Sequence, residues 1–407
     1  MWSLTPDGEV QGKVAKHPSL RNGEEILTSC LSCPHLAATD AIVATRSGSL
    51  YRLRKPGKPS VKISRTIRPQ SSSPSGKVPS LRIPSLKIPG MEATTPSKMI
   101  ESTIDYDLNG ETLGDGKYLL AGSPVPTKNK RSCTMTAYLA GPDGNPRGDA
   151  LIVKFSNNED AMTREHTNFQ KLWSTVKRGV IVRCFDYYPN ADSTQSHKMQ
   201  CALVLERGTQ DLKQFRHVFD TIDDATLKNA LWMVARCMSG IHSARYVWTD
   251  LKTENFVSFE DTEKKGKLTF KGIDLESAVP VKGHPIDYTP EACPPEFARA
   301  FEDKEPQSFV LEYSYDVWSF GMMALELSMG ECYFEKLGIR RWDAIMKKVA
   351  ALDDSSIDVS SLVSDETLAS LITQCLTVDP KKRPTSQAIL KHPYFRGIGL
   401  QSMFGSW

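Results

Sequence analysis

The sequence of 407 residues lacks any apolar run close to the roughly 20 residues that a membrane-spanning helix needs. Its first residues, MWSLTPDGEVQG, lack the basic segment and apolar core of a secretory signal. The chain also lacks a strong excess of one charge, since its formal net charge is only +3. These absences argue against a secreted or membrane-spanning protein. The small net charge gives no indication that the chain as a whole binds nucleic acid.

A repeated cysteine spacing is also missing. Nine cysteines occur without a repeated spacing, which is typical of reduced thiols inside a cell rather than of a disulfide framework. Cys30 and Cys33 form a C-x-x-C pair, with His35 two residues further on. Zinc needs four ligands and no second matching pair lies nearby, so we interpret these residues as ordinary thiols. We expect an intracellular protein of the cytoplasm or nucleus.

Positive charge is concentrated in one segment. Twelve Lys or Arg residues lie between Arg46 and Lys98, against the single acidic residue Glu92. The same stretch contains RPQSSSPSGKVPSLRIPSLKIPG, whose composition buries too little apolar surface to offset chain entropy. Residues 58–100 are therefore predicted to form a flexible basic linker. It serves either as a solvated tether or as a docking segment for an acidic partner, an anionic surface or nucleic acid.

The apolar periodicity changes along the chain. Residues 1–57 alternate in places (EEILTSCL, DAIVATRSGSLYRL), which predicts a few short strands. Residues 101–396 begin with strand-like pieces and continue with helical spacing after Asp211. The strand-like pieces are KYLLAG, CTMTAYLA, ALIVKF, IVRCFDYY and QCALVLE, with the helical stretch EDAMTREHTNFQKLW between the third and fourth. This order predicts an α+β fold with a small β-rich N-lobe and a larger helical C-lobe, followed by a short tail at 397–407.

One loop between two apolar runs carries Asp250, Lys252 and Asn255 in YVWTDLKTENFV. It resembles the catalytic loop of the eukaryotic protein kinases, H-R-D-L-K-x-x-N. The resemblance implies that Asp250 orients the substrate hydroxyl and accepts its proton, and that Lys252 steadies the transferring phosphoryl group. A lysine at this position favours the serine/threonine type.

The resemblance extends to residues that hold nucleotide and metal. Lys154 in ALIVKF is similar to the kinase lysine that binds the α- and β-phosphates of ATP, and Glu165 is the candidate for its ion pair, with Glu159 as the alternative. A predicted hairpin ends at Asp274, which would coordinate Mg²⁺ together with Asn255, since oxygen ligands suit a hard cation.

The segment CALVLERGTQDL resembles the hinge that binds adenine. Leu205 would be the gatekeeper residue, Glu206 and Gly208 would offer backbone groups to adenine, and Asp211 could meet the ribose.

Three motifs further along the chain resemble architectural parts of the same family. YTPEACPPEFA is similar to the end of the activation segment, with Thr289 placed to touch Asp250 and Lys252. SYDVWSFGMMALEL resembles the following buried helix, whose Asp316 would hold the catalytic-loop backbone. In CLTVDPKKRPTSQAILKHPYF, Arg383 is placed to pair with Glu296.

Four departures from the family pattern matter. Between the first two strands of the N-lobe, AGSPVPTKNKRSCT offers one glycine and two prolines, which cannot donate an N–H to a phosphate. Ile152 replaces the small residue against which adenine packs. Trp248 and Thr249 replace the His-Arg pair, so no arginine is available there to bind an activation-segment phosphate. The D-F-G motif is replaced by 274–276, Asp-Leu-Glu.

Each motif alone has an ordinary structural interpretation, but their order and flanking sequences favour the kinase-like one. The resemblance predicts an enzyme that uses ATP and Mg²⁺ to phosphorylate Ser or Thr hydroxyls of a protein substrate. The alternative is a pseudokinase, a binding scaffold with a kinase fold and little phosphoryl transfer.

Overall fold

The computed structural model divides the chain into two units, residues 1–100 and 101–407, which we describe separately. In the second unit the structure describes residues 109–126, 132–176, 179–189, 201–218, 223–260, 268–303, 305–306 and 308–398. In the first unit it describes five short strands: β1 (Trp2–Leu4), β2 (Val10–Lys13), β3 (Glu25–Leu27), β4 (Ile42–Ala44) and β5 (Leu50–Arg52). Strands β1–β3 form an antiparallel sheet and β4–β5 a hairpin, where the sequence predicts short strands. The basic segment 58–100 and the Cys30–Cys33 pair lie outside the described residues.

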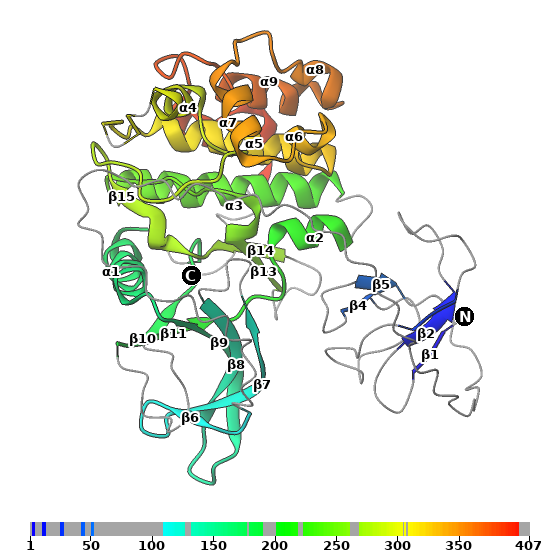
Figure 1. Ribbon diagram of the computed structural model, residues 1–407, viewed down its shortest axis with the longest axis vertical. Coiled ribbons are helices and arrows are strands. Elements are labelled where there is room, and N and C mark those ends of the chain that lie inside the picture. The colour runs from blue at the N-terminus through cyan, green and yellow to red at the C-terminus, as the bar shows by residue number, and fades with distance from the viewer. Residues whose placement is uncertain are drawn as a thin grey trace, which may run out of the picture. The chain divides into compact units, whose positions relative to one another are not determined.

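The second unit begins with an antiparallel sheet of six strands, ordered β10-β11-β9-β8-β7-β6 (Figure 1). Its strands are β6 (Thr112–Leu113), β7 (Tyr118–Pro126), β8 (Ser132–Ala140), β9 (Pro146–Ser156), β10 (Cys184–Tyr188) and β11 (Cys201–Glu206). Along β9, Leu151, Val153 and Phe155 are buried in the core of this sheet. Because successive side chains of a strand point to opposite faces, Ile152 and Lys154 lie on the other face.

Helix α1 (Glu159–Thr175) lies against this sheet and is the only helix placed between two of its strands in the described sequence. It begins at Asn158, whose side chain accepts a hydrogen bond from the backbone N–H of Ala161 at 3.1 Å. Its buried face carries Phe169 and Leu172, together with the polar residue Glu165. The helix therefore brings a carboxylate to the side of the sheet.

The remaining helices form a separate lobe (Figure 1). They are α2 (Leu212–Val218), α3 (Asp224–Ser243), α4 (Pro295–Glu302), α5 (Ser314–Met329), α6 (Tyr333–Lys336), α7 (Trp342–Ala350), α8 (Val359–Leu362), α9 (Glu366–Cys375) and α10 (Ser386–Leu390). Helix α5 is buried around most of its circumference, as expected for a helix at the centre of a core. No helix in the described part of the chain is long and apolar enough to cross a membrane.

Two small two-stranded antiparallel sheets follow α3 in the chain. Strand β12 (Tyr246–Trp248) pairs with β15 (Ala278–Pro280), and β13 (Phe256–Glu260) pairs with β14 (Leu268–Gly272). Strand β11 also contributes to both lobes, because Ala202 and Val204 belong to the sheet core whereas Cys201, Leu203 and Leu205 belong to the larger core. The predicted α+β fold with two segregated lobes is confirmed. Asp274, between β14 and β15, lies 3.0 Å from Lys154 of the six-stranded sheet, so this segment lies at the junction of the lobes.

Candidate active site

Asp250, in the loop between β12 and β13, is held by bonds from two residues of that loop and from Thr289. Thr289 donates its hydroxyl hydrogen to Asp250 Oδ1 at 2.6 Å, and Lys252 Nζ donates to Oδ2 at 2.6 Å. Asn255 Nδ2 donates to the Asp250 backbone oxygen at 2.8 Å. Burial raises the pKa of Asp250, and the attraction of Lys252 opposes that shift. The three predicted residues of this loop are therefore in mutual contact, with the carboxylate held in one orientation.

Lys154 and Glu165 form the ion pair that the sequence predicts. Lys154 Nζ lies 2.7 Å from Glu165 Oε2 and 3.0 Å from Asp274 Oδ1. Burial would lower the pKa of Lys154, but the two carboxylates outweigh burial and raise it. Glu159, the alternative partner, is exposed at the first position of α1. The lysine therefore links the sheet, helix α1 and the segment at Asp274.

A third carboxylate, that of Glu276, lies beside this pair. One carboxylate oxygen from each of Glu165, Asp274 and Glu276 lies within 4.8 Å of the others. Arg164 Nη2 donates to Glu276 Oε1 at 3.3 Å. Burial raises the pKa of Glu165 to about 7, although Lys154 opposes the shift. Glu165 Oε1 is buried and has no hydrogen-bond partner among the described residues. Such an all-oxygen set suits a hard divalent cation.

Asp274 has a left-handed backbone conformation, with φ 59° and ψ 61°. Asp tolerates this region better than most residues, and the surrounding bonds hold it there. Trp248 Nε1 donates to the Asp274 backbone oxygen at 3.2 Å. Asn168 Nδ2, from helix α1, donates to the backbone oxygens of Leu275 at 2.8 Å and Ala278 at 2.7 Å. The segment after Asp274 is therefore tied to α1.

Trp248 and Thr249, the departures from the family's His-Arg pair, both make structural bonds. The backbone N–H of Trp248 donates to Asp316 Oδ2 at 2.7 Å, so Asp316 holds the catalytic-loop backbone as the sequence predicts. Thr249 Oγ1 lies 2.7 Å from the Asp287 backbone oxygen and 3.2 Å from that of Ser277. A hydroxyl group therefore links the catalytic loop to the segment that runs from Asp274 to Thr289.

The hinge residues lie at the end of β11 and the start of α2. Gly208 packs so closely that an added Cβ would lie 2.6 Å from Val257 Cβ, which explains a glycine there. The Glu206 side chain forms an ion pair with Lys271 and accepts a hydrogen bond from the Arg183 backbone N–H at 3.1 Å. Asp211 Oδ1 accepts from the Gln214 backbone N–H at 2.7 Å, which stabilises the start of α2. Contacts of these residues with adenine or ribose stay a prediction.

The turn that replaces the glycine-rich loop begins with an irregularity in β7. The register between β7 and β8 shifts between Ala121 and Val125, and Gly122 in this stretch has φ +80°. The Gly122 N–H donates to Asn109 Oδ1 at 2.9 Å, so it is used within the protein. Pro124 and Pro126 have no N–H to offer. Residues 127–131 lie outside the described residues.

Sequence reasoning missed two residues that position the site. Asn168 is buried on α1, one turn beyond Glu165, and a polar residue on the apolar face of a predicted helix was a usable signal. The ring N–H of Trp248 holds Asp274, but nothing in the sequence indicates this partner, which lies 26 residues away.

The two-lobe fold, with its nucleotide-type lysine and its catalytic-type loop at the lobe junction, defines a protein-kinase architecture. Residues 145–395 match the protein kinase domain family, and the chain belongs to this family. The chain is 26% identical over 302 residues to Aurora kinase of Debaryomyces hansenii, covering 74% of this chain and 64% of that protein. It is 22% identical over 263 residues to serine/threonine-protein kinase 1 of African swine fever virus, covering 63% and 76%.

A third relative matches a shorter stretch of this chain. The probable serine/threonine-protein kinase CCRP1 of Zea mays is 32% identical over 163 residues, which cover 38% of this chain. The chain thus spans 64% of the Debaryomyces protein and 23% of the maize protein.

Proposed function

We propose that this protein transfers the γ-phosphoryl group of ATP to a Ser or Thr hydroxyl of a protein substrate. The observation that carries the proposal is the arrangement at Asp250, whose carboxylate is bonded to Thr289 on one oxygen and to Lys252 on the other. A threonine in contact with the catalytic aspartate and lysine resembles the serine/threonine kinases. Two of the named relatives, from maize and from African swine fever virus, are serine/threonine kinases by their printed names, in keeping with this specificity.

The residues of the loop would act on the substrate hydroxyl. Asp250 orients the hydroxyl and takes its proton as the oxygen forms a bond to the γ-phosphorus, while the bond from that phosphorus to the β-γ bridging oxygen breaks. Burial favours this role, because it raises the pKa of Asp250 and makes the carboxylate a better proton acceptor. Lys252, adjacent to it, neutralises charge on the transferring group.

The nucleotide and metal would lie at the Lys154 cluster. ATP with Mg²⁺ supplies the phosphoryl group and a leaving group whose charge the cation neutralises. The donor atoms fit a hard cation: Asp274 and Glu276 offer carboxylates. Asn255 uses its Nδ2 toward Asp250, so its Oδ1 would be the atom available to the cation. Lys154 would bind the phosphates, and the backbone of Glu206 and Gly208 would bind adenine, with Asp211 near the ribose.

A pseudokinase scaffold is the second candidate, and the N-lobe turn favours it. The Gly122 N–H is already used by Asn109, and two prolines follow, so fewer backbone donors are available to phosphates. Ile152 lies on the same face of β9 as Lys154 and would narrow the adenine site. The two candidates differ in whether ATP binding and transfer survive these changes.

Phosphoryl transfer can be tested with the purified chain, radiolabelled ATP and a mixture of protein substrates, followed by phosphoamino-acid analysis. Asp250→Asn should lower the rate about 10²–10⁴-fold, the usual contribution of a positioned general base. Asp343→Asn, at an exposed pair with Arg341, is the matched control and should keep full activity. Equal rates for wild type and Asp250→Asn would contradict the assignment, and label on tyrosine would contradict the specificity.

Nucleotide binding can be tested separately by thermal shift. A ligand at about a hundredfold excess over its Kd stabilises the folded state by about 2.7 kcal/mol. We expect a smaller, Mg²⁺-dependent shift at millimolar ATP, because the turn after β7 offers few donors. Lys154→Ala should abolish the shift. No shift with or without Mg²⁺, together with no transfer, would favour the scaffold.

A further inference from the structure

A cavity of about 650 Å³ opens beside the hinge, and its volume is typical of ligand-binding pockets, which span about 300–1,000 Å³. Neither Lys154 nor Asp250 lines it. Leu151 does, and its side chain lies on the face of β9 opposite to that of Ile152 and Lys154. The cavity therefore lies outside the candidate active site. Three aromatic and three basic residues line what we call the hinge pocket: Trp173, Phe185, Phe259, Arg183, Arg207 and Lys271.

The hinge pocket keeps an excess of positive charge. Its carboxylate at Glu206 is already committed, because Oε1 pairs with Lys271 Nζ and Oε2 accepts a hydrogen bond from the Arg183 backbone N–H at 3.1 Å. The guanidinium groups of Arg183 and Arg207 form no ion pair with a carboxylate in the described part of the chain. Against them stands one exposed carboxylate, that of Asp149. An anion that enters the pocket would therefore meet two guanidinium groups with free hydrogen-bond donors.

Two of the basic side chains lie over aromatic rings. The guanidinium carbon of Arg183 lies 4.7 Å from the centroid of the Phe185 ring, and Lys271 Nζ lies 4.3 Å from the centroid of the Phe259 ring. Stacking restrains a guanidinium group and leaves its N–H edge available to a carboxylate. Phe185 is 37% exposed, so part of its ring also remains available for contact. The pocket thus offers aromatic surface and fixed positive charge side by side.

We propose that the hinge pocket binds an acidic segment of a partner protein, in which an aromatic side chain lies next to carboxylates. The aromatic ring would pack among Trp173 and Phe185, and a neighbouring carboxylate would form a bidentate pair with Arg183 or Arg207. The inference goes beyond the proposed phosphoryl transfer and does not depend on it, because it concerns binding alone.

The exposure of the lining favours a peptide over a small metabolite. Arg183, Phe185 and Arg207 are all exposed, so the pocket is open to solvent on the side that they line. Sites for small molecules usually enclose 70–90% or more of the ligand surface. An open pocket instead leaves room for the chain of a bound peptide to continue on both sides of the residue that enters it.

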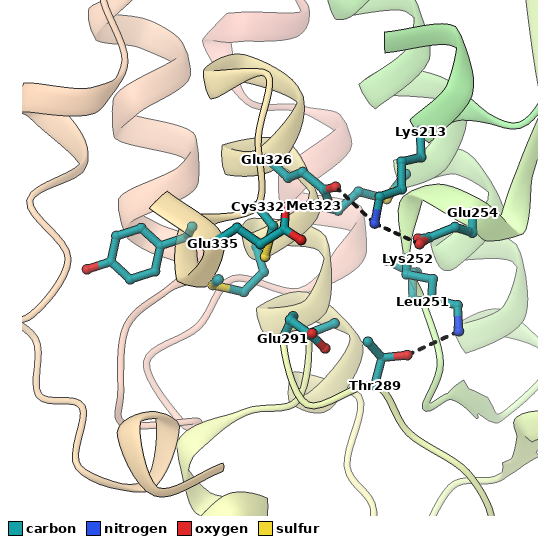
Figure 2. A pocket seen from close by; sticks show the side chains of 13 residues that line it. Lys213, Leu251, Lys252, Glu254, Thr289, Glu291, Met323, Glu326, Cys332 and Glu335 are labelled. Carbon is teal, nitrogen blue, oxygen red and sulfur yellow. Dashed lines mark hydrogen bonds and ion pairs between the residues drawn. The ribbon is translucent and has the colours of Figure 1, made fainter. Parts of the chain in front are cut away.

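The pocket beside the catalytic loop, drawn in Figure 2, has the opposite charge. Four carboxylates line it, and Lys213 lies between two of them, 2.9 Å from Glu254 Oε1 and 3.8 Å from Glu326 Oε1. These carboxylates would repel an acidic peptide, whereas the hinge pocket would attract it. Charge therefore directs such a peptide to the hinge pocket rather than to the pocket of Figure 2.

The experiment measures the Kd of the full-length chain for a labelled peptide with one phenylalanine between two pairs of glutamates, by fluorescence anisotropy without ATP. Arg183→Gln and Arg207→Gln should each weaken binding about tenfold, because each removes a charged donor. Asp149→Asn should strengthen binding, because it removes the carboxylate that competes with the peptide. Arg340→Gln, at an exposed arginine of the helical lobe, makes the same change in net charge and is the matched control, with an unchanged Kd.

Two altered peptides test the two halves of the recognition. Replacing the phenylalanine by alanine, or the glutamates by glutamine, should each weaken binding at least tenfold. Equal affinity of the glutamine peptide, equal effects of Arg207→Gln and Arg340→Gln, or no binding at millimolar peptide would each overturn the assignment. Phenylacetate that competes as well as the peptide would indicate a metabolite site and also overturn it. Arg183→Lys, which keeps the charge but cannot form a bidentate pair, should bind with intermediate affinity and provides a second variant should the glutamine variants fold poorly.

Discussion

Replacing Arg383 with alanine should destabilise the protein strongly, because its guanidinium is fully buried and makes every one of its bonds inside the protein. Arg383 Nη1 and Nη2 bond to Glu296 Oε1 and Oε2 at 2.7 and 2.8 Å, a bidentate pair between the segment that precedes α10 and the start of α4. Three further bonds reach the backbone oxygens of Thr377, Ser314 and Val378. The guanidinium also lies over the Trp318 ring, 5.0 Å from its centroid.

The magnitude follows from what the substitution leaves behind. Removing one partner of a buried ion pair costs about 3–5 kcal/mol, because the other charge stays buried without compensation. Glu296 is such a partner, with 20% of its side chain exposed. The three carbonyl groups lose a donor as well, which adds to the cost where water cannot replace it. We expect a loss of about 4 kcal/mol or more, or roughly 8–16 °C in Tm for a domain of this size.

The assay is calorimetric or urea unfolding of wild type, Arg383→Ala, Arg383→Lys and the control Arg341→Ala. Lysine keeps the charge but cannot form the bidentate pair, so it should show an intermediate loss. Arg341 pairs with Asp343 but is 82% exposed, and its removal should change stability by less than about 1 kcal/mol. If Arg383→Ala and Arg341→Ala unfold at the same temperature, the reasoning from burial and bidentate geometry is wrong.

Two further predictions concern the hydroxyl of Thr249 and the buried carboxylate of Glu326. Thr249→Val removes the hydroxyl that bonds to the backbone oxygens of Asp287 and Ser277. We therefore expect slower phosphoryl transfer with an unchanged ATP-dependent thermal shift. A transfer rate equal to that of wild type would contradict this prediction. Glu326 has a pKa raised from 4.5 to about 7, so the folded protein binds its proton more tightly than the unfolded chain does, and stability is lost as pH rises through 7. Relative to Glu326→Gln, urea unfolding of wild type should therefore lose up to about 3 kcal/mol between pH 5 and pH 8, and parallel pH profiles would refute the shift.

The fold was predictable wherever apolar periodicity was strong. The strand ALIVKF and helix α1 were found from sequence because their buried residues recur at strand and helix spacing. The beginning of β9 was missed, since residues 146–149 are exposed and carry no alternation, and they become a strand only by pairing with β8. Residues 181–183 were expected to continue a strand, but β10 begins at Cys184. Ile181 instead forms an isolated bridge with Gly272.

In the candidate site, too, contacts between residues close in sequence were predictable and contacts between distant residues were not. Motif spacing placed Asp250, Lys252 and Asn255 together, because residues two to five positions apart in one loop must lie close. The pairing of Lys154 with Glu165 required only a strand followed directly by a helix. By contrast, the bonds from Asn168 to the segment after Asp274 join residues more than 100 positions apart. Such contacts depend on how the lobes pack, which no local pattern encodes.

Glu276 replaces the glycine of the family's D-F-G motif, and its contacts show how the structure accommodates an acidic side chain at this position. Glu276 adds a negative charge beside Asp274 and Glu165, which would repel one another without a cation. Lys154 lies between Glu165 and Asp274, and Arg164, directly before Glu165 on α1, pairs with Glu276 at 3.3 Å. The Arg164 pair joins α1 to the segment that Asn168 also holds. A glycine at this position would leave the backbone free to move, whereas Glu276 binds it to the helix that carries the lysine's partner. The orientation of α1 and the position of Asp274 are therefore coupled by bonds within the chain, without a phosphate.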